Sequence, residues 1–314
     1  MRIKPDSVTR LCLVMSILLS LLVLSCGTNK QITQPDTNDS LNLAFGTDSS
    51  FDLVTWNIEN FPKHDPETSE LLSNILPNLH ADCIAVQEVA NTSALYSLVN
   101  KMTGWSYRIS SSGDTKTAIL FNTATVQVDS FATIFTGMSN PFPRAPLLVR
   151  LHWQNQVIYL ISMHLKAFGD NVIDASDPND EEVRRQYACK LIDQYIERNL
   201  PDQKVIVVGD MNDQIQEPPS TNVFMTFINK PDEYCFADMS IAQHITEQNC
   251  SYPYYLSQLD HILITNELFS AFNTSGKYVR TLQIENYITP GGWSNYENMI
   301  SDHRPVAARF IFSD

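Results

Sequence analysis

The chain has 314 residues, a formal net charge of −14, 43% hydrophobic and 18% charged residues, and six cysteines. This hydrophobic content excludes a chain that is disordered throughout, and the length allows one sizeable core. The acidic balance argues against tight, sequence-independent binding of duplex nucleic acid, because such binding depends on clustered lysine and arginine.

The N-terminal segment is typical of a secretory signal. Basic residues within the first ten positions precede an apolar run from Leu11 to Leu24, which is too short to span a membrane as a mature helix. The run ends in Ser25-Cys26, which resembles a bacterial lipobox. We predict a lipoprotein signal peptide over residues 1–25, lipidation at Cys26, and an extracytoplasmic protein anchored by lipid to a bacterial membrane. An ordinary signal peptide cut elsewhere and an uncleaved anchor are the alternatives.

The next segment is polar. Gly27 to Ser50 is rich in Thr, Asn, Asp, Gln and Ser and lacks a sustained apolar period. Such a segment cannot bury enough apolar surface to offset its conformational entropy. The sequence therefore predicts a flexible tether over residues 26–50, followed by a single folded domain over residues 51–314.

Short apolar or alternating runs in this domain are typical of strand interiors, and helical patterns lie between them. Strands are predicted for Phe51–Trp56, Asp82–Gln87, Thr117–Phe121, Leu147–Trp153, Val157–Met163, Val205–Val208, Leu259–Ile264 and Val306–Phe312, and helices for Glu67–Leu79, Ser93–Met102 and Asp180–Asn199. The last helix has the clearest 3.6-residue period, and acidic residues at its start suit the helix dipole. Strands interleaved with helices indicate an α/β protein.

Polar side chains with metal-binding or proton-transferring groups stand at or beside one end of six of these apolar runs. The six motifs are Trp56-Asn57-Ile58-Glu59-Asn60-Phe61, Val86-Gln87-Glu88-Val89, Ser162-Met163-His164-Leu165-Lys166, Val208-Gly209-Asp210-Met211-Asn212-Asp213, Leu259-Asp260-His261-Ile262 and Ser301-Asp302-His303-Arg304-Pro305-Val306. In this order they resemble the endonuclease/exonuclease/phosphatase superfamily of deoxyribonuclease I-like enzymes. The resemblance spans about Phe51 to Phe312. It implies a four-layer α-β-β-α sandwich of two mixed β-sheets flanked by helices, with a phosphoester-cleaving site along one rim.

The resemblance also implies a metal site. Glu88 and Asn57 are hard oxygen donors that suit Mg²⁺ or Mn²⁺, with Ca²⁺ as a further option. By resemblance Glu88 is the principal metal ligand, Asn57 lies beside it, and Asp302 reaches the metal region. Glu59 either contacts the metal or supports its ligands.

Proton transfer and phosphate binding are implied for the remaining motif residues. Asp210 would orient or deprotonate water, and Asn212 would bind the scissile phosphate. His303 would pair with Asp260, an arrangement that fixes the imidazole tautomer and favours the charged ring. His164 is the second catalytic imidazole; which of the two is the acid and which the base stays open.

Two basic residues are weaker candidates for phosphate contacts. Arg144 matches a basic position that family members place near phosphate, and a solvated loop charge is the alternative. Lys166 follows His164 closely enough to touch substrate. The aromatic run from Tyr252 to Tyr255 receives no role, because such side chains more often pack.

Four cysteines lie in the predicted domain. Cys83 and Cys189 sit in apolar patterns and are predicted to be buried thiols. Cys235 and Cys250 flank a loop ahead of Asp260 and would form a disulfide in an oxidising compartment, with two unpaired thiols as the alternative.

The sequence thus favours a divalent-metal-dependent phosphodiesterase, specifically an extracytoplasmic nuclease acting on DNA or RNA. A phosphomonoesterase or phospholipase acting on inositol phosphates, sugar phosphates or sphingomyelin is the alternative, since specificity resides in loops. A surface-binding lipoprotein without catalysis is a third hypothesis. The expected partners are nucleic acid as substrate and the membrane through the N-terminal lipid; no obligate protein partner is indicated.

Overall fold

The computed structural model describes residues 43–273, 278–288 and 291–313. The predicted signal peptide and the predicted lipidation site at Cys26 lie outside the described residues. Within the described part, no helix combines the length and apolarity that crossing a membrane requires.

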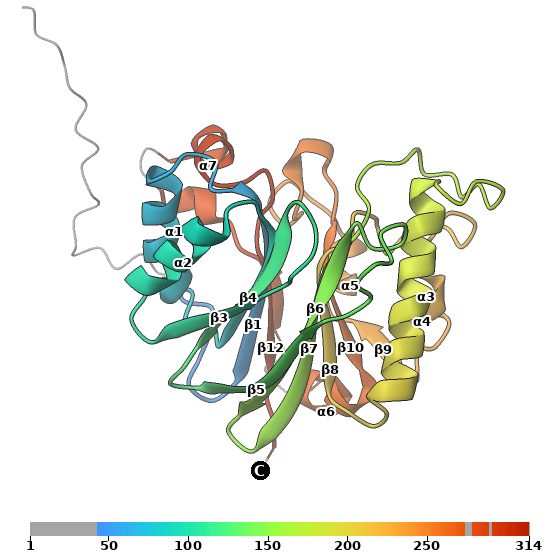
Figure 1. The fold of residues 1–314 in the computed structure, drawn as a ribbon, viewed down its shortest axis with the longest axis horizontal. Coiled ribbons are helices and arrows are strands. Elements are labelled where there is room, and N and C mark those ends of the chain that lie inside the picture. Colours follow the sequence, from blue (N-terminus) through green and yellow to red (C-terminus); the bar gives the residue numbers. More distant parts are fainter. Residues whose placement is uncertain (1–42, 274–277, 289–290, 314) are drawn as a thin grey trace, which may run out of the picture. The chain divides into compact units, whose positions relative to one another are not determined.

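Two six-stranded mixed sheets form the centre of the domain (Figure 1). The first sheet has the strand order β11-β12-β1-β2-β4-β3 and the second β5-β6-β7-β8-β10-β9. The strands are β1 (Phe51–Phe61), β2 (Cys83–Val89), β3 (Trp105–Ile109), β4 (Lys116–Asn122), β5 (Val126–Thr133), β6 (Arg144–Trp153), β7 (Gln156–His164), β8 (Val205–Asp210), β9 (Tyr234–Phe236), β10 (Asp260–Thr265), β11 (Tyr278–Thr281) and β12 (Val306–Phe310).

Helices cover the outer face of each sheet. The α-helices are α1 (Glu67–Asn78), α2 (Thr92–Lys101), α3 (Glu181–Asn199), α4 (Met225–Ile228), α5 (Met239–Ala242), α6 (Phe269–Asn273) and α7 (Trp293–Met299), and the 3₁₀ turns are η1 (Pro253–Tyr255), η2 (Asn266–Leu268) and η3 (Ile284–Asn286). Helices α1 and α2 pack on the first sheet and α3 on the second (Figure 1). The predicted four-layer α-β-β-α sandwich is confirmed.

The alternation of side chains in β1 shows why the sheet needs cover on both faces. Successive residues of a strand point to opposite faces. Val54 and Trp56 enter the core under α1 and α2, whereas Phe51 and Leu53 enter the core between the two sheets. All four side chains are 0% exposed, so β1 is apolar on both faces. This is why its sequence is a nearly continuous apolar run.

All eight predicted strands and all three predicted helices are present, with ends that differ by a few residues. The largest difference is β1, which continues to Phe61 and so contains Asn57 and Glu59. Strands β3, β5, β9 and β11 were not predicted. Every residue of β3 is only half-buried and most of β5 is exposed, so neither carries a strong apolar signal.

The predicted tether extends too far toward the C-terminus. Leu43 and Phe45 are buried in the core under α1, and the backbone N–H of Phe45 donates to the carbonyl of Leu79. The ring of Phe45 also packs against Tyr278 at 5.4 Å. Two apolar residues are too few to form a recognisable sequence pattern. They nevertheless pack in the core of the folded domain, which therefore begins before residue 51.

The predicted disulfide is wrong. Cys250 is a buried free thiol and neighbours Ser251, whose hydroxyl accepts from the backbone N–H of Asp260 at one end of β10. Cys235 pairs with Ile264 near the other end of that strand. Four residues of strand separate these ends by about 13 Å, whereas bridged Cα atoms lie about 4.4–6.8 Å apart. Cys83 and Cys189 are buried free thiols, as predicted.

Candidate active site at the sheet rim

Strand pairing brings the predicted site residues to one rim of the sandwich. His164 ends β7 and pairs with Asp210, which ends β8, and Asp210 pairs in turn with Asp260 at the start of β10. His303 comes shortly before β12, whose first residue, Val306, pairs with Thr55 of β1. His164 and His303 therefore face the same rim, although they are 139 positions apart in the chain.

Gly209 makes the close approach of β7 and β8 possible. Its φ is +143°, and a Cβ added there would lie 1.8 Å from the carbonyl oxygen of Met163. Only glycine tolerates this conformation and contact. The Gly-Asp sequence thus lets the backbone of β8 lie against β7, which sets Asp210 beside His164.

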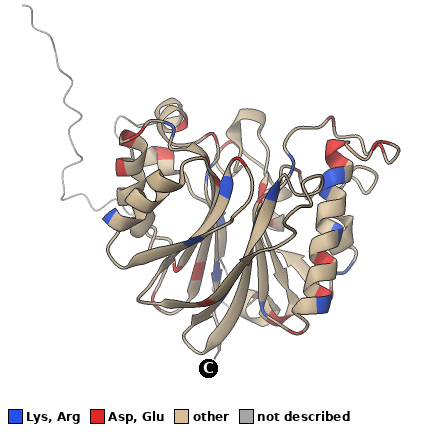
Figure 2. Ribbon diagram, in the orientation of Figure 1, with Lys and Arg blue, Asp and Glu red and all other residues tan. Residues whose placement is uncertain are grey.

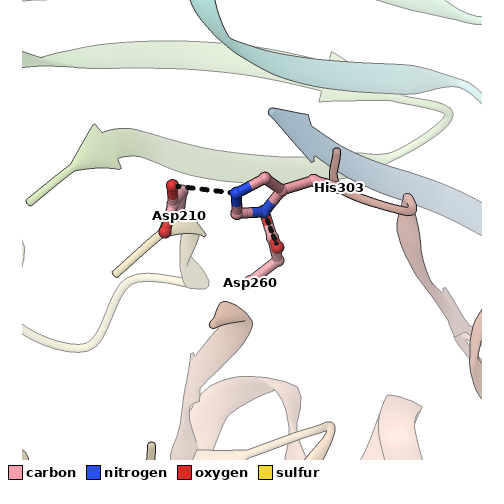
Figure 3. Close-up of side chains that lie close together, drawn as sticks. All are labelled: Asp210, Asp260 and His303. Carbon is pink, nitrogen blue, oxygen red and sulfur yellow. Dashed lines mark hydrogen bonds and ion pairs between the residues drawn. The ribbon is translucent and has the colours of Figure 1, made fainter. Parts of the chain in front are cut away.

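Asp210 is the centre of the hydrogen-bonding arrangement. Its Oδ2 accepts from Nδ2 of Asn57 at 2.9 Å and lies 3.4 Å from Nε2 of His164. Nε2 of His303 lies 3.8 Å from the same oxygen (Figure 3). Burial raises the pKa of Asp210, and the charge of His303 partly offsets this effect.

Two bulges orient Asn57 and Glu88. The pairing of β1 with β2 shifts register between Asn57 and Phe61, and the pairing of β2 with β4 shifts register between Val86 and Val89, where Glu88 has a φ of +62°. Bulges of this kind turn a side chain away from the regular alternation and are frequent beside active sites. As a result Oε1 of Glu88 accepts from Nδ2 of Asn57 at 3.2 Å, and its Oε2 accepts from the backbone N–H of Asn60 at 2.9 Å.

A group of three carboxylates adjoins Asn57. Oε2 of Glu59 accepts from the backbone N–H of Asp302 at 2.9 Å. Burial raises the pKa of Asp302 to about 6; His303 opposes this, while the negative charges of Glu59 and Glu88 add to it. Carboxylates that raise each other's proton affinity in this way form a donor set that fits a hard divalent cation.

A second group, Asp210, Asp260 and His303, offers ligand atoms that lie within 4.8 Å of one another (Figure 3). Nδ1 of His303 lies 2.7 Å from Oδ2 of Asp260, while Nε2 faces Asp210. Because both ring nitrogens face carboxylates, both carry protons, and a doubly protonated imidazole has no lone pair for a metal. The carboxylates of Glu59, Glu88 and Asp302, with Asn57, are therefore the better fit.

The charge of His303 follows from its surroundings. Burial lowers its pKa, but the carboxylates of Asp260 and Asp210 more than compensate and hold the pKa above its ordinary value. Its backbone is also fixed: the carbonyl of His303 accepts from Nε1 of Trp56 at 3.1 Å, and its N–H donates to Oγ of Ser301 at 2.9 Å. His303 is a positioned imidazolium.

His164 is the opposite case. Burial, reinforced by the positive charges of Arg144 and His303, holds its pKa well below the ordinary value. Nε2 faces the carboxylates of Asp210 and Glu88, at 3.4 and 3.9 Å, so the proton of the neutral ring belongs on Nε2. Nδ1 is buried and has no hydrogen-bond partner in the described part of the chain. His164 therefore presents an N–H donor to the site.

The remaining candidates are placed differently. The backbone N–H of Asn212 donates to Oδ1 of Asp210, and its side chain reaches the carbonyl of Leu165. Arg144 pairs with His164 across β6 and β7, which puts its charge at the rim. Lys166 instead forms an ion pair with Glu181 of α3 at 3.2 Å.

The structure adds residues that the motifs did not indicate. The ring of Tyr252 lies 4.7 Å from the ring of His303. The next two aromatics, Tyr254 and Tyr255, are 66% and 72% exposed. Nζ of Lys63 donates to Glu59 at 2.6 Å. Nothing in the local sequence connects Tyr252 with a histidine about fifty residues further on, so only the fold could reveal this contact.

A family comparison agrees with this geometry: residues 54–303 match the endonuclease/exonuclease/phosphatase family. The chain belongs to that family. Its members are metal-dependent hydrolases of phosphoester bonds. No curated protein matches the sequence.

Solved structures show the same fold at low identity. TDP2 of D. rerio, complexed with a single-strand DNA product, has a TM-score of 0.62 and 16% identity over 84% of this chain and 99% of that one. The human Nocturnin catalytic domain with a bound sulfate anion has a TM-score of 0.58 and 16% identity over 84% and 95%. An endonuclease/exonuclease/phosphatase from Bacteroides vulgatus has a TM-score of 0.57 and 12% identity over 84% and 99%.

Proposed function

We propose that this chain is an extracytoplasmic, divalent-metal-dependent nuclease that hydrolyses phosphodiester bonds in DNA or RNA. One observation carries the chemistry: a buried carboxylate, Asp210, lies between a neutral imidazole, His164, and a charged one, His303. Hydrolysis of a phosphodiester requires a group that takes a proton from water and a group that gives one to the leaving oxygen. This arrangement supplies both within one site.

The metal would be held by Glu88, Asn57, Asp302 and Glu59, whose oxygens suit Mg²⁺ or Mn²⁺. Bound there, the ion would polarise a phosphoryl oxygen and neutralise charge that develops during the reaction. It would also relieve the repulsion among the three carboxylates.

Asp210, His303 and His164 have separate roles in the proposed reaction. Asp210, with a pKa raised by burial, takes the proton of the attacking water, and Asn57 orients its carboxylate. His303 gives a proton from Nε2 to the leaving oxygen, while Asp260 holds the ring through Nδ1. His164 donates a hydrogen bond from Nε2 to a phosphoryl oxygen, where it stabilises negative charge.

Exposed aromatic side chains beside the site favour a nucleic acid over a small phosphoester. Tyr254 and Tyr255 follow Tyr252, which packs on the ring of His303. Near Lys166 the ring of Phe168 is 86% exposed. Bases of single strands stack on such rings regardless of sequence, and this compensates for the lack of a strongly basic surface.

The proposed location rests on the sequence alone. The apolar run up to Leu24 and the Ser25-Cys26 junction support a lipid anchor at Cys26. A nuclease held at a membrane would act on nucleic acid outside the cytoplasm.

The test is a substrate panel. The purified protein with Mg²⁺ or Mn²⁺ should cleave single-stranded DNA or RNA more efficiently than bis-p-nitrophenyl phosphate, p-nitrophenyl phosphate, inositol phosphates or sphingomyelin. Tyr254→Ala combined with Tyr255→Ala should raise KM for oligonucleotides at least ~30-fold, in line with roughly 1–3 kcal/mol for each of two stacked bases, and leave small diesters unaffected. The exposed Tyr96→Ala, on α2, is the matched control. Preferential turnover of a monoester or sphingomyelin would reject the nuclease proposal.

A further inference from the structure

The loop between β7 and α3 carries a high density of acidic residues. Six carboxylates lie between Ala167 and Val183, and this interval contains no lysine or arginine. The acidic residues are Asp170, Asp174, Asp177, Asp180, Glu181 and Glu182. Figure 2 shows acidic positions along this loop and at the start of α3, next to the basic residues of the helix.

Three of these carboxylates converge. Asp170, Asp180 and Glu182 each contribute one oxygen, and the three oxygens lie within 4.8 Å of one another. Asp170 is exposed, Asp180 half-buried and Glu182 buried. Among the described residues neither Asp170 nor Asp180 forms an ion pair with lysine or arginine. Three converging charges of one sign are unfavourable without a counter-charge.

An independent observation comes from Glu182 itself. Its side chain is 2% exposed, yet its Oε2 has no hydrogen-bond partner among the residues that the structure describes. The carboxylate lies so close to the backbone that a Cβ on residue 169 would be 2.1 Å from Oε1 and 2.8 Å from Oε2, and Gly169 provides the space. A buried carboxylate oxygen without a partner is costly, so a ligand for it is expected.

Arg185 does not supply the missing charge. It pairs with Oε1 of Glu182 at 3.0 Å, but it also pairs with the buried Asp213 at 2.8 Å. Its Nη1 donates to the carbonyls of Lys166 and Phe168. One guanidinium thus serves two buried carboxylates and two carbonyls, and Oε2 of Glu182 remains unmatched.

We propose that Asp170, Asp180 and Glu182 bind a calcium ion, separate from the catalytic metal. Ca²⁺ takes six to eight oxygen ligands in irregular geometry, whereas Mg²⁺ requires a near-ideal octahedron and gives up its waters reluctantly. A cluster with one exposed, one half-buried and one buried carboxylate suits the first ion, with water completing the coordination at Asp170. Affinities of about 10⁻⁴–10⁻³ M are typical of extracellular calcium modules.

Calcium at this position would hold the segment that follows His164. The segment is already tied to α3 through Arg185, which binds the carbonyls of Lys166 and Phe168. Linking Asp170 to Asp180 and Glu182 would add a second connection between the same loop and the same helix. The site is therefore structural, and its test does not depend on activity.

The test measures thermal unfolding of the full chain, purified in detergent, during titration with CaCl₂. All proteins carry Glu88→Gln, which removes the principal ligand of the proposed catalytic metal. In this background Tm should rise saturably, by roughly 3–6 °C at ten times Kd. Asp170→Asn, at an exposed position that folding tolerates, and Glu182→Gln should each abolish the rise. Asp174→Asn, in the same loop but outside the cluster, should retain it.

The proposal fails if Ca²⁺ causes no saturable rise in the Glu88→Gln background, or if the Asp170→Asn protein keeps the full rise. An equal response to MgCl₂ would show a general ionic effect and also overturn it. Absence of nuclease activity in the protein that retains Glu88, together with an intact calcium response in the Glu88→Gln series, would instead refute the proposed function and leave this site standing.

Discussion

Replacement of Asp210 by Asn should separate catalysis from stability. The side chains have the same shape, but an amide cannot take a proton from water. Loss of a general base lowers turnover by about 10²–10⁴-fold, so we expect kcat of Asp210→Asn to fall by at least ~100-fold on the best phosphodiester substrate.

The effect on stability should have the opposite sign. Burial raises the pKa of Asp210 from 3.8 to about 7, so the ionised carboxylate destabilises the fold by on the order of 4 kcal/mol at pH 8. Asn removes this penalty. Its amide nitrogen must, however, face a donor on one side, because Oδ1 accepts from Asn212 and Oδ2 from Asn57. That lost hydrogen bond costs about 1–3 kcal/mol.

The net expectation is a gain on the order of 2 kcal/mol, or roughly 4–8 °C in Tm at pH 8. Melting is measured in EDTA, because a bound cation would stabilise the wild-type carboxylates. The native wild type keeps the proton on Asp210 below the raised pKa, so the ionisation penalty shrinks as pH falls from 7, the net gain reaches zero at roughly pH 5, and near pH 4 the variant should be the less stable protein. The exposed Asp48→Asn is the control and should change neither kcat nor Tm. A variant that retains kcat within tenfold, or that melts well below wild type at pH 8, would refute this reasoning.

Three further predictions concern separate parts of the chain. Glu88→Gln should weaken Mg²⁺ binding at least ~10-fold by isothermal titration calorimetry and reduce kcat at least ~100-fold; unchanged Mg²⁺ affinity would exclude Glu88 as a ligand. His261→Gln should lower Tm more at pH 6 than at pH 9. Burial lowers the pKa of His261, but Asp238 raises it above 6.5, so the stability from the charged ring is lost as pH rises through that raised pKa; an equal loss at both pH values would contradict the charged pair. Cys26→Ala should abolish lipid attachment, and mass spectrometry showing a wild-type N-terminus other than a modified Cys26 would reject the anchor.

The local sequence was sufficient for most elements because their apolar residues repeat at strand or helix spacing. Val205 to Val208 is an uninterrupted β-branched run and forms β8, and the predicted helix from Asp180 corresponds to α3 with Asp180 as its N-cap. Strands whose residues are exposed or half-buried, such as β5, leave no such pattern and were missed. Their position depends on the neighbouring strand and not on their own composition.

The candidate site residues show the same division between what the local sequence predicts and what only the fold decides. The motifs indicated the side chains with metal-binding and proton-transferring groups, because each motif adjoins an apolar run that has one end at the rim. They did not indicate that Glu88 has a positive φ, that Tyr252 packs on His303, or that Lys166 is directed to Glu181. They also suggested a Cys235–Cys250 bridge that the ends of β10 hold apart.

The sequence by itself determined which residues with metal-binding and proton-transferring side chains adjoin the apolar strands, because periodicity and turn chemistry act over a few residues. Only the tertiary structure decided how these residues differ from one another. His164 and His303 have the same side chain, yet one is held neutral by burial beside Arg144 and the other charged between Asp210 and Asp260. Burial and the distances between charges arise from strand pairing across the whole chain, so no local pattern can specify them.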